Sequence, residues 1–414
     1  MINTNDKGNI TRVCDHKEIG KHFGYYFTDS SVGGNHPFLC EKAAIVIQTL
    51  KRFIENEEQK RGLHLLQTPL ISRTDFLDKS SHLSHYNDLI FNTENINGSK
   101  LSFRPVTCPF HFVFFNHNKH SYNDLPIGYF ETTYVFRKCK KGEQDGLYRT
   151  QIFSIGDCHI FCRKEQIYSE LNKSLDYIVS LSKILGIIDD IKFVLSSGVS
   201  KKNQLLGEEN EWIEARRYLS DTLSNKNIIY TENGNSAAFY GPKIDVFFKS
   251  IHKDIALFTI QLDFQLAKQF QISYKNELNQ KEYPIIIHRS SVSSYERLLG
   301  VLLEKYQGDL PFWLAPIQVK IFIIDQICFN YGQEVEKNLL DNGFRAKTEV
   351  IDRGVLSTKI REETLQKTHF IIVIGKNEMA QKNISVRCYN KNDIKKTNLN
   401  CFINELKTLY PRST

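Results

Sequence analysis

The sequence predicts an α+β protein in which a domain built on an antiparallel sheet flanked by helices is followed by a small α/β domain. Three observations predict this architecture. Strand-like segments dominate the middle of the chain, several of them alternate apolar with polar residues, and strands and helices alternate near the C-terminus. A chain of 414 residues also exceeds the size of one core, which seldom grows past about 250–300 residues. We expect domains of residues 1–312 and 313–414.

The first long element expected is a helix within residues 37–62. Apolar residues recur at helical spacing from Ala43 to Ile54, and Gly62 is a plausible stop. Further helices are expected at residues 163–185 and 209–222. The strand-like segments of this part are residues 63–71, 100–108, 127–138, 147–161, 238–249 and 256–264.

The pattern changes after "QGDLPFWLAPIQ", where Pro311 and Pro316 bracket the expected junction. From there strands and helices alternate, as they do in a small α/β domain. Strands are expected at residues 318–324, 345–351, 371–376 and 383–389, and helices at residues 334–344 and 356–370.

Composition narrows the class of protein. With 41% hydrophobic and 24% charged residues the chain resembles an average globular protein, so neither disorder nor a membrane role is indicated. No apolar run reaches the roughly 20 residues that span a bilayer, and the N-terminus lacks an apolar signal segment. Nine widely spaced cysteines predict a reducing compartment, and we expect a cytoplasmic protein. The net charge of +7 permits a polyanionic partner without requiring one.

Three residues far apart in the chain are candidate metal ligands. Cys108, His159 and His288 each lie at or near the end of a strand-like segment, in "VTCPFH", "SIGDCHIF" and "PIIIHRS". No local spacing links them. From the residues alone, a buried cysteine and hydrogen-bonded histidines are the more frequent explanation, and metal binding is the alternative.

Arginines form a second group of candidates. Arg137 and Arg149 flank a polar loop with two glycines between strand-like segments, which is an arrangement able to fold over an anion. A solvated basic loop is the alternative. Arg297 lies on an expected helix whose first turn contains Ser293 and Ser294, where the helix dipole favours phosphate. Neither a "GxxxxGK[ST]" loop nor a "GxGxxG" loop is present, so those nucleotide folds have no support.

These segments, in this order, resemble the class II aminoacyl-tRNA synthetases and, within them, the threonyl-tRNA synthetase family. The likeness runs from "DHKEIGKHFGYYF" to "TKIREETLQKTHFIIVIGKNE" and leaves out the extreme N-terminus and the C-terminal tail. Its most specific motifs are "RPVTCPFHFVFFN", "FRKCKKGEQDGLYRTQIFSIGDCHIFC", "AFYGPKIDV", "TIQLDF" and "IIIHRSSVSSYERLLGVLLEKYQ".

The resemblance implies a zinc site that selects threonine. Its three protein ligands are expected to be Cys108, His159 and His288, with a fourth position open to substrate. His111 matches the histidine of the family's Cys-Pro-Gly-His signature and is not expected to be a ligand. Further residues are expected to orient the substrate's polar groups, and these are Asp157, Tyr240 and Gln261.

The resemblance also implies an ATP site that works with Mg²⁺. Arg137 is expected to hold the α-phosphate and the amino-acid carboxylate, and Arg149 to approach the γ-phosphate. Phe153 is expected to stack on adenine, and Arg297 to contact the γ-phosphate and the other face of the base. Arg137 and Arg297 are therefore the expected catalytic residues, acting by positioning and charge stabilisation.

Two partners follow from the resemblance. The first is threonine tRNA, whose anticodon is expected to contact Arg361, Glu378 and Arg387. Hydrogen-bonding side chains of this kind read bases that are splayed out from a single-stranded loop. Pro69 falls in the motif that supports a homodimer in this class.

The chain begins at what resembles the start of the catalytic domain, so we expect a short form without the family's N-terminal and editing domains, unable to remove mischarged serine in cis.

Several residues depart from the family pattern around the expected pocket. Where the family has polar residues or glycine, this chain has Phe110, Cys139, Ile155, Ala256, Phe258 and Ser293. Three functions therefore stay open. The chain activates threonine and charges tRNA, or it is a duplicated synthetase-like protein with an altered pocket, serving inhibitor resistance or another acceptor, or it is a non-catalytic tRNA-binding regulator.

Overall fold

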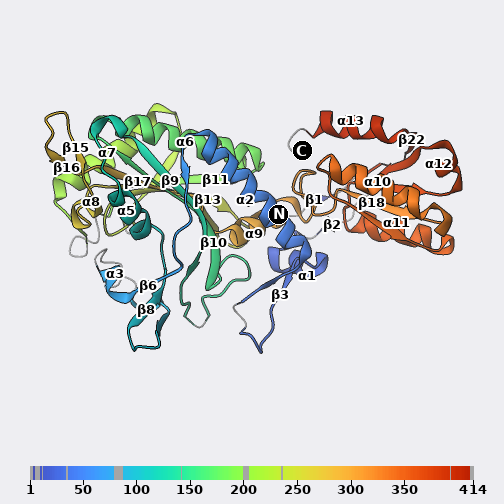
Figure 1. The fold of residues 1–414 in the computed structure, drawn as a ribbon, viewed down its shortest axis with the longest axis horizontal. Coiled ribbons are helices and arrows are strands. Elements are labelled where there is room, and N and C mark those ends of the chain that lie inside the picture. The colour runs from blue at the N-terminus through green and yellow to red at the C-terminus, as the bar shows by residue number, and fades with distance from the viewer. Residues whose placement is uncertain are drawn as a thin grey trace. The chain divides into compact units, whose positions relative to one another are not determined.

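An eight-stranded sheet forms the centre of the larger part of the protein (Figure 1). The computed structural model describes residues 3–4, 10–11, 13–33, 36–78, 87–140, 142–198, 205–234, 236–391 and 393–410. The strands of the eight-stranded sheet lie in the order β12-β11-β13-β14-β17-β10-β9-β5. Neighbours are antiparallel except for the β11–β12 and β5–β9 pairs, so the predicted antiparallel sheet is confirmed. The strands are β5 (His64–Leu65), β9 (Ile127–Phe136), β10 (Ile152–Cys162), β11 (Ile191–Ser196), β12 (Tyr230–Asn233), β13 (Lys243–Lys249), β14 (Asp254–Asp263) and β17 (Ile285–Val292).

The residues that the structure describes form two compact units. The first consists of residues 28–37 and 50–301, and the second of residues 38–49, 302–410 and the described residues before Thr28. Helices α2 (Glu41–Lys60) and α9 (Tyr295–Tyr306) have residues in both. The domain boundary expected between residues 312 and 313 stays a prediction.

Helices and smaller sheets surround the central sheet of the first unit. Helix α6 (Ile167–Ile184) contacts β10, β14 and β17, and α7 (Glu209–Asn225) contacts β13 and β14, so the two helices lie side by side on one sheet face. The remaining elements are α3 (Thr74–Asp78), α5 (Cys108–His117) and α8 (Leu266–Gln269), the small sheet of β6 (Ile71–Arg73), β8 (Lys100–Phe103) and β7 (Asn92–Glu94), and the hairpin of β15 (Tyr274–Lys275) and β16 (Lys281–Glu282).

The apolar stripe predicted for the first long helix is confirmed. Ala43, Val46, Leu50 and Ile54 of α2 are fully buried, as expected for one face of a helix with 3.6 residues per turn. Each buried Val, Leu or Ile side chain of this kind contributes about 1.5–3 kcal/mol to stability. The helix ends at Lys60 and is followed by Gly62 in the left-handed region, at φ 82°, which glycine adopts without strain.

Several predicted strands are wrong in their extent. Those expected at residues 147–161 and 238–249 begin only at Ile152 and Lys243, and two others are interrupted at a proline. The strand expected at residues 63–71 is broken around Pro69 into β5 and β6, because proline has no backbone N–H to donate to a sheet. The strand expected at residues 100–108 ends at Phe103, and Cys108 instead begins helix α5. Pro109 follows in the first turn of α5, where its fixed φ favours helix initiation.

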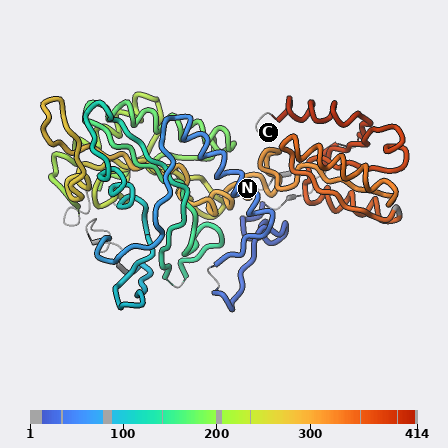
Figure 2. Tube along the Cα trace, in the orientation of Figure 1, coloured from blue at the N-terminus to red at the C-terminus, as the bar shows by residue number. Residues whose placement is uncertain are grey.

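A five-stranded sheet forms the core of the second unit. Its order is β19-β18-β20-β21-β22, and Figure 2 shows the orange and red trace that forms it with its helices. The alternation predicted after residue 317 is confirmed, while α12, β22 and the last helix were not predicted. The elements are β18 (Val319–Ile323), α10 (Phe329–Asp341), β19 (Ala346–Val350), α11 (Leu356–Leu365), β20 (Phe370–Ile374), α12 (Lys376–Gln381), β21 (Ile384–Cys388), β22 (Ile394–Thr397) and α13 (Leu399–Leu409).

The N-terminal elements belong to the second unit as well. They are β1 (Asn3–Thr4), β2 (Ile10–Thr11), α1 (His16–Phe23), β3 (Tyr26–Phe27) and β4 (Phe38–Leu39). Across the part of the chain that the structure describes, no helix has the length and apolarity needed to cross a lipid bilayer.

Candidate active site

The three predicted metal ligands converge in the first unit. Cys108 is the first residue of α5, His159 lies in β10, and His288 lies in β17 directly opposite His159. One donor atom from each lies within 4.8 Å of the others, and all three residues are buried. One thiol and two imidazoles on rigid elements form a donor set that suits zinc with a fourth position left for a substrate. The residues therefore fit the group that the resemblance implies.

Both histidines are held by hydrogen bonds from outside this cluster. His288 Nε2 lies 2.9 Å from Asp263 Oδ2, and His159 Nδ1 lies 2.9 Å from His111 Nδ1. Tyr240 stacks on the His288 ring, with 4.8 Å between the ring centroids. The orientation of each imidazole is thus fixed by neighbours that are themselves anchored.

A cavity of about 330 Å³ opens beside the cluster. Every residue predicted to bind threonine lines it, together with Arg137. The three predicted metal ligands and the departures Ile155 and Ser293 line it too. The lining residues that were not predicted are Val106, Ser236, Ala237, Ala238, Lys243, Thr259 and Ser290.

The predicted threonine-binding residues are tied to one another and to the walls. Tyr240 Oη donates to Gln261 Oε1, which joins the segment before β13 to β14. Thr107 Oγ1 donates to Asp157 Oδ2. Burial raises the pKa of Asp157, and the Thr107 hydrogen bond and nearby positive charges offset only part of this effect. Gln261 lies opposite His288 across the β14–β17 pair, so strand register alone places an amide next to the cluster.

A second cavity of about 190 Å³ adjoins the first, because Arg137 lines both. Arg149, Phe153 and Arg297, the predicted ATP-binding residues, line it. The guanidinium carbon of Arg137 lies 5.5 Å from the centre of the Phe153 ring. Arg137 Nε donates to the Pro105 carbonyl at 2.8 Å, and this bond fixes the plane of the guanidinium group.

Three arginines around this second cavity make it strongly cationic. Arg297 Nε donates to Tyr148 O at 3.0 Å, and its Nη1 donates to Ala256 O at 3.0 Å. Burial, and then the charges of Arg137 and Arg149, lower the pKa of Arg297 to about 10. An anion entering the cavity would relieve this repulsion, so the site favours polyanionic ligands.

The departures from the family pattern divide into two groups. Ile155 and Ser293 line the first cavity and Cys139 lines the second, so these three substitutions change the cavity walls. Phe110 and Phe258 are buried and do not line either cavity. Phe110 packs edge-on against Phe76, with 5.3 Å between the ring centroids, so its bulk is absorbed by packing next to α3. Ala256 contributes its carbonyl to the bonds with Arg297 and Ser293.

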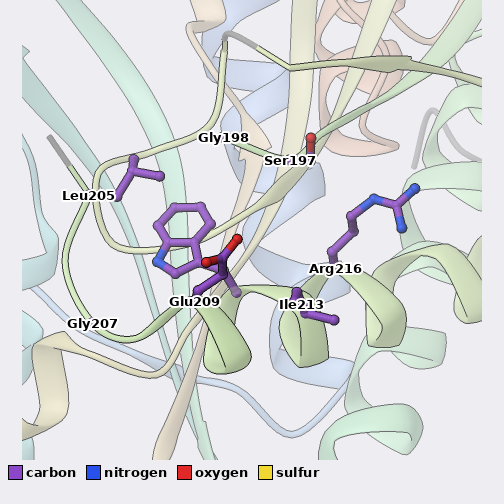
Figure 3. Close-up of a pocket in the computed structure, with 8 residues that line it drawn as sticks. Ser197, Gly198, Leu205, Gly207, Glu209, Ile213 and Arg216 are labelled. Carbon is purple, nitrogen blue, oxygen red and sulfur yellow. The ribbon is translucent and has the colours of Figure 1, made fainter. Parts of the chain in front are cut away.

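A third cavity of about 250 Å³ shares no lining residue with the other two. Figure 3 shows Glu209, Ile213 and Arg216 extending from α7, with Leu205 on the facing loop. Its wall is mainly apolar, in contrast with the arginine-lined second cavity, so it does not suit a nucleotide.

The predicted anticodon residues lie on separate elements of the second unit. Glu378 in α12 accepts from Ser385 Oγ at 2.9 Å and from Gly375 N at 3.0 Å, so its carboxylate caps α12 and holds β21. Arg387 is two residues from Ser385 on β21 and therefore on the same strand face. Arg361 is exposed on α11.

Sequence reasoning missed residues that support the ligands, and some could have been found. Asp263 lies two positions after Gln261 in a strand, so both side chains point to the same sheet face. Glu131 and Lys243 offered no comparable signal, because only strand pairing brings them to the site.

Two family models match the chain. One describes the tRNA synthetase class II core domain (G, H, P, S and T) and covers residues 91–306, and the other describes an anticodon binding domain and covers residues 316–409. A threonine–tRNA ligase of Clostridium perfringens strain 13 is 38% identical over 377 residues, which are 90% of this chain and 58% of the relative. One of Clostridium botulinum strain Eklund 17B is 37% identical over 402 residues, or 95% and 62%.

Similar solved structures also come from threonyl-tRNA synthetases. The RNA binding domain of threonyl-tRNA synthetase from Cryptosporidium parvum superimposes with a TM-score of 0.89 at 32% identity, covering 95% of this chain and 98% of that one. The putative threonyl-tRNA synthetase ThrRS-1 from Aeropyrum pernix, at 23% identity and a TM-score of 0.82, shares the fold. This chain spans about three fifths of the length of the curated relatives, 58% and 62% of the two above. By sequence and by structure the chain belongs to the threonyl-tRNA synthetase family of the class II tRNA synthetases.

Proposed function

We propose that the chain activates threonine with ATP, forming threonyl-adenylate, and transfers the threonyl group to threonine tRNA. The observation that carries this proposal is that two cavities meet at Arg137, one beside a Cys-His-His cluster and one lined by further arginines. Amino-acid-dependent ATP–pyrophosphate exchange, followed by charging of purified tRNA, tests the two steps separately. Exchange without charging would assign another acceptor, and the absence of exchange would contradict the activity.

In the first step a threonine carboxylate oxygen attacks the α-phosphorus of ATP. An O–P bond forms, the bond from the α-phosphorus to the bridging oxygen of the β-phosphate breaks, and pyrophosphate leaves. In this proposal Arg137 binds both the carboxylate and the α-phosphate, Arg149 and Arg297 hold the remaining phosphates, and Mg²⁺ accompanies ATP. Fixed cations at these points stabilise the charge that develops in the transition state.

In the second step a ribose hydroxyl at the 3′ end of the tRNA attacks the carbonyl carbon of the adenylate. The ester bond forms, the bond to the AMP phosphate oxygen breaks, and AMP leaves. Residues 1–312 carry both reactions in this proposal, and residues 313–414 bind the anticodon.

Zinc held by Cys108, His159 and His288 would supply a Lewis-acid position for the amino group and hydroxyl of threonine. Asp157, Tyr240 and Gln261 then orient these groups from the cavity wall. Valine has the same shape but lacks the hydroxyl. Serine keeps the hydroxyl and lacks one methyl group.

We therefore expect the enzyme to reject valine much more strongly than serine. In ATP–pyrophosphate exchange, kcat/KM for valine should fall about 10⁴-fold below that for threonine, because polar groups that bind a hydroxyl are left unpaired by an analogue without one. Serine should fall only about 10–200-fold, since one methyl group supplies little discrimination. Comparable kcat/KM values for valine and threonine would contradict the assignment of the pocket.

The anticodon assignment predicts a separation of charging from activation. Arg387→Ala should lower kcat/KM for tRNA by about 5–150-fold, the equivalent of 1–3 kcal/mol for a base-reading arginine, and leave exchange unchanged. Lys395→Ala, which removes a surface lysine paired with Glu405 at 2.6 Å, is the matched control in the same unit. Equal loss of exchange and charging in Arg387→Ala would contradict the assignment.

A second copy of this chain is the proposed partner at the segment around Pro69. Large apolar side chains on β5, on α5 and beside Pro69 are 39–53% exposed, and they are Leu65, Leu70, Ile71, Val113 and Phe114. Exposed large apolar side chains in these segments support a protein interface there. Sedimentation equilibrium at micromolar concentration should give twice the monomer mass.

A further inference from the structure

A buried line of polar side chains leads away from the metal ligands and takes no part in the chemistry proposed above. His111 Nδ1 lies 2.9 Å from His159 Nδ1, and His111 Nε2 lies 3.3 Å from Glu131 Oε2. The two imidazole rings meet edge-on, at 90°. His111 and Glu131 are both fully buried. Buried polar groups are costly unless each has a defined partner, so this arrangement needs a physical account.

The far end of the line is anchored by hydrogen-bond donors. Thr68 donates to Glu131 from its backbone N at 2.9 Å and from its Oγ1 at 2.7 Å. Arg104 Nη2 donates to Glu131 Oε1 at 3.1 Å, and Arg104 Nη1 donates to Thr68 Oγ1 at 2.7 Å. Glu131 is therefore surrounded by donors and acts as a fixed acceptor toward His111.

This anchoring determines which ring nitrogens carry hydrogen. A neutral His111 that donates its Nε2–H to Glu131 has its lone pair on Nδ1, which therefore accepts. The facing atom, His159 Nδ1, must then be the donor of that 2.9 Å bond. A neutral imidazole has one donor and one acceptor nitrogen, so the lone pair of His159 is on Nε2.

His288 is fixed in the same way by a different residue. Its Nε2 faces Asp263 Oδ2 at 2.9 Å, while Asp263 Oδ1 accepts from the backbone N of Gln265 and Leu266 at 2.7 and 2.9 Å. The lone pair of His288 is therefore on Nδ1. Both imidazoles are set, by partners outside the cluster, in the tautomer that a metal ligand requires.

We propose that His111, held by Glu131, is a positioning residue for the metal site, because it fixes the tautomer and the ring orientation of His159. The inference rests on the zinc site of the proposed function and extends it to residues that do not contact the metal. Partners of this kind contribute about 10–100-fold to metal affinity, so His111 should matter to zinc binding although it is not a ligand.

Three substitutions at His111 separate positioning from packing. In His111→Asn the side-chain oxygen can replace Nδ1 as the acceptor for His159. In His111→Gln the amide extends toward Glu131 and leaves His159 without an acceptor, and in His111→Phe no acceptor remains. His120→Phe is the matched control, because His120 Nε2 contacts the Phe115 carbonyl at 3.0 Å and no ligand.

Zinc affinity, measured on the full chain by competition with a chromophoric chelator, should fall about 10–100-fold in His111→Gln and His111→Phe. It should be unchanged in His111→Asn and His120→Phe. The d–d absorption of the Co²⁺-loaded protein should shift in the same two variants. Far-UV circular dichroism establishes that each variant is folded.

Zinc affinity equal to that of the unsubstituted protein in His111→Gln would overturn the inference. If His111→Phe does not fold, the Asn and Gln variants, which carry the same amide, decide the matter, and equal affinity in that pair overturns it. Loss of zinc in His288→Ala with normal binding in every His111 variant refutes the positioning role and leaves the metal site intact. Full zinc binding in His288→Ala refutes both.

Discussion

Replacing Arg137 with glutamine should lower kcat/KM for ATP–pyrophosphate exchange by about 10³-fold. Arg137 lines both cavities, and its Nε bond to Pro105 O at 2.8 Å holds the remaining guanidinium nitrogens in one plane at their junction. The variant removes a charge from the point where the carboxylate and the α-phosphate must meet. The loss should therefore appear in kcat and in the apparent KM for both ATP and threonine.

Two further substitutions make this prediction specific. Arg137→Lys keeps the charge but loses the planar fork and the bond to Pro105, and it should still lose about 10²-fold. Arg149→Gln changes an arginine that lines only the second cavity, so it should raise the KM for ATP and leave that for threonine unchanged. Arg217→Gln is the surface control, since its side chain is 69% exposed. Full exchange activity in Arg137→Lys would show that charge alone suffices.

Periodic patterns predicted the fold well, and proline accounts for two of the errors in strand extent. The stripe from Ala43 to Ile54 and the alternation after residue 317 depend on local spacing, which a sequence displays directly. The segment from β5 to α5 depends on Pro69 and Pro109, which end or interrupt a strand where the apolar pattern alone favours one. Short strands such as β12 and β22 lack a long apolar pattern, and their pairing with neighbours decides their conformation.

Some features of the candidate site could likewise be predicted from the sequence, and others depend on the folded chain. Individual motifs suggested its residues, but no spacing joined Cys108 to His159 and His288. The antiparallel register of β10 and β17 places the two histidines opposite each other, and α5 brings the cysteine to them. Long-range pairing of this kind is absent from local sequence. The support from Asp263 was accessible, since it shares a strand face with Gln261, whereas Glu131 and His111 meet only in the folded chain.

Replacing His288 with alanine should abolish stoichiometric zinc binding. After dialysis against a chelator, metal analysis should find one zinc per chain in the unsubstituted protein and almost none in the variant, because two ligands hold zinc at least about 100-fold more weakly than three. Threonine-dependent exchange should fall with the metal. The substitution also removes the ring on which Tyr240 stacks, so the threonine KM should rise more than the ATP KM.

The variant should remain folded, which makes the measurement interpretable. Asp263 loses its bond to His288, yet its Oδ1 still accepts from Gln265 and Leu266, so the carboxylate keeps partners and the expected cost is about 1–3 kcal/mol. Urea unfolding measures that cost. His120→Ala makes the same chemical change outside the cluster and should retain zinc. A folded His288→Ala protein that keeps one zinc per chain would place the metal elsewhere, and the cavity beside Tyr240 would lose its basis for recognising a hydroxyl.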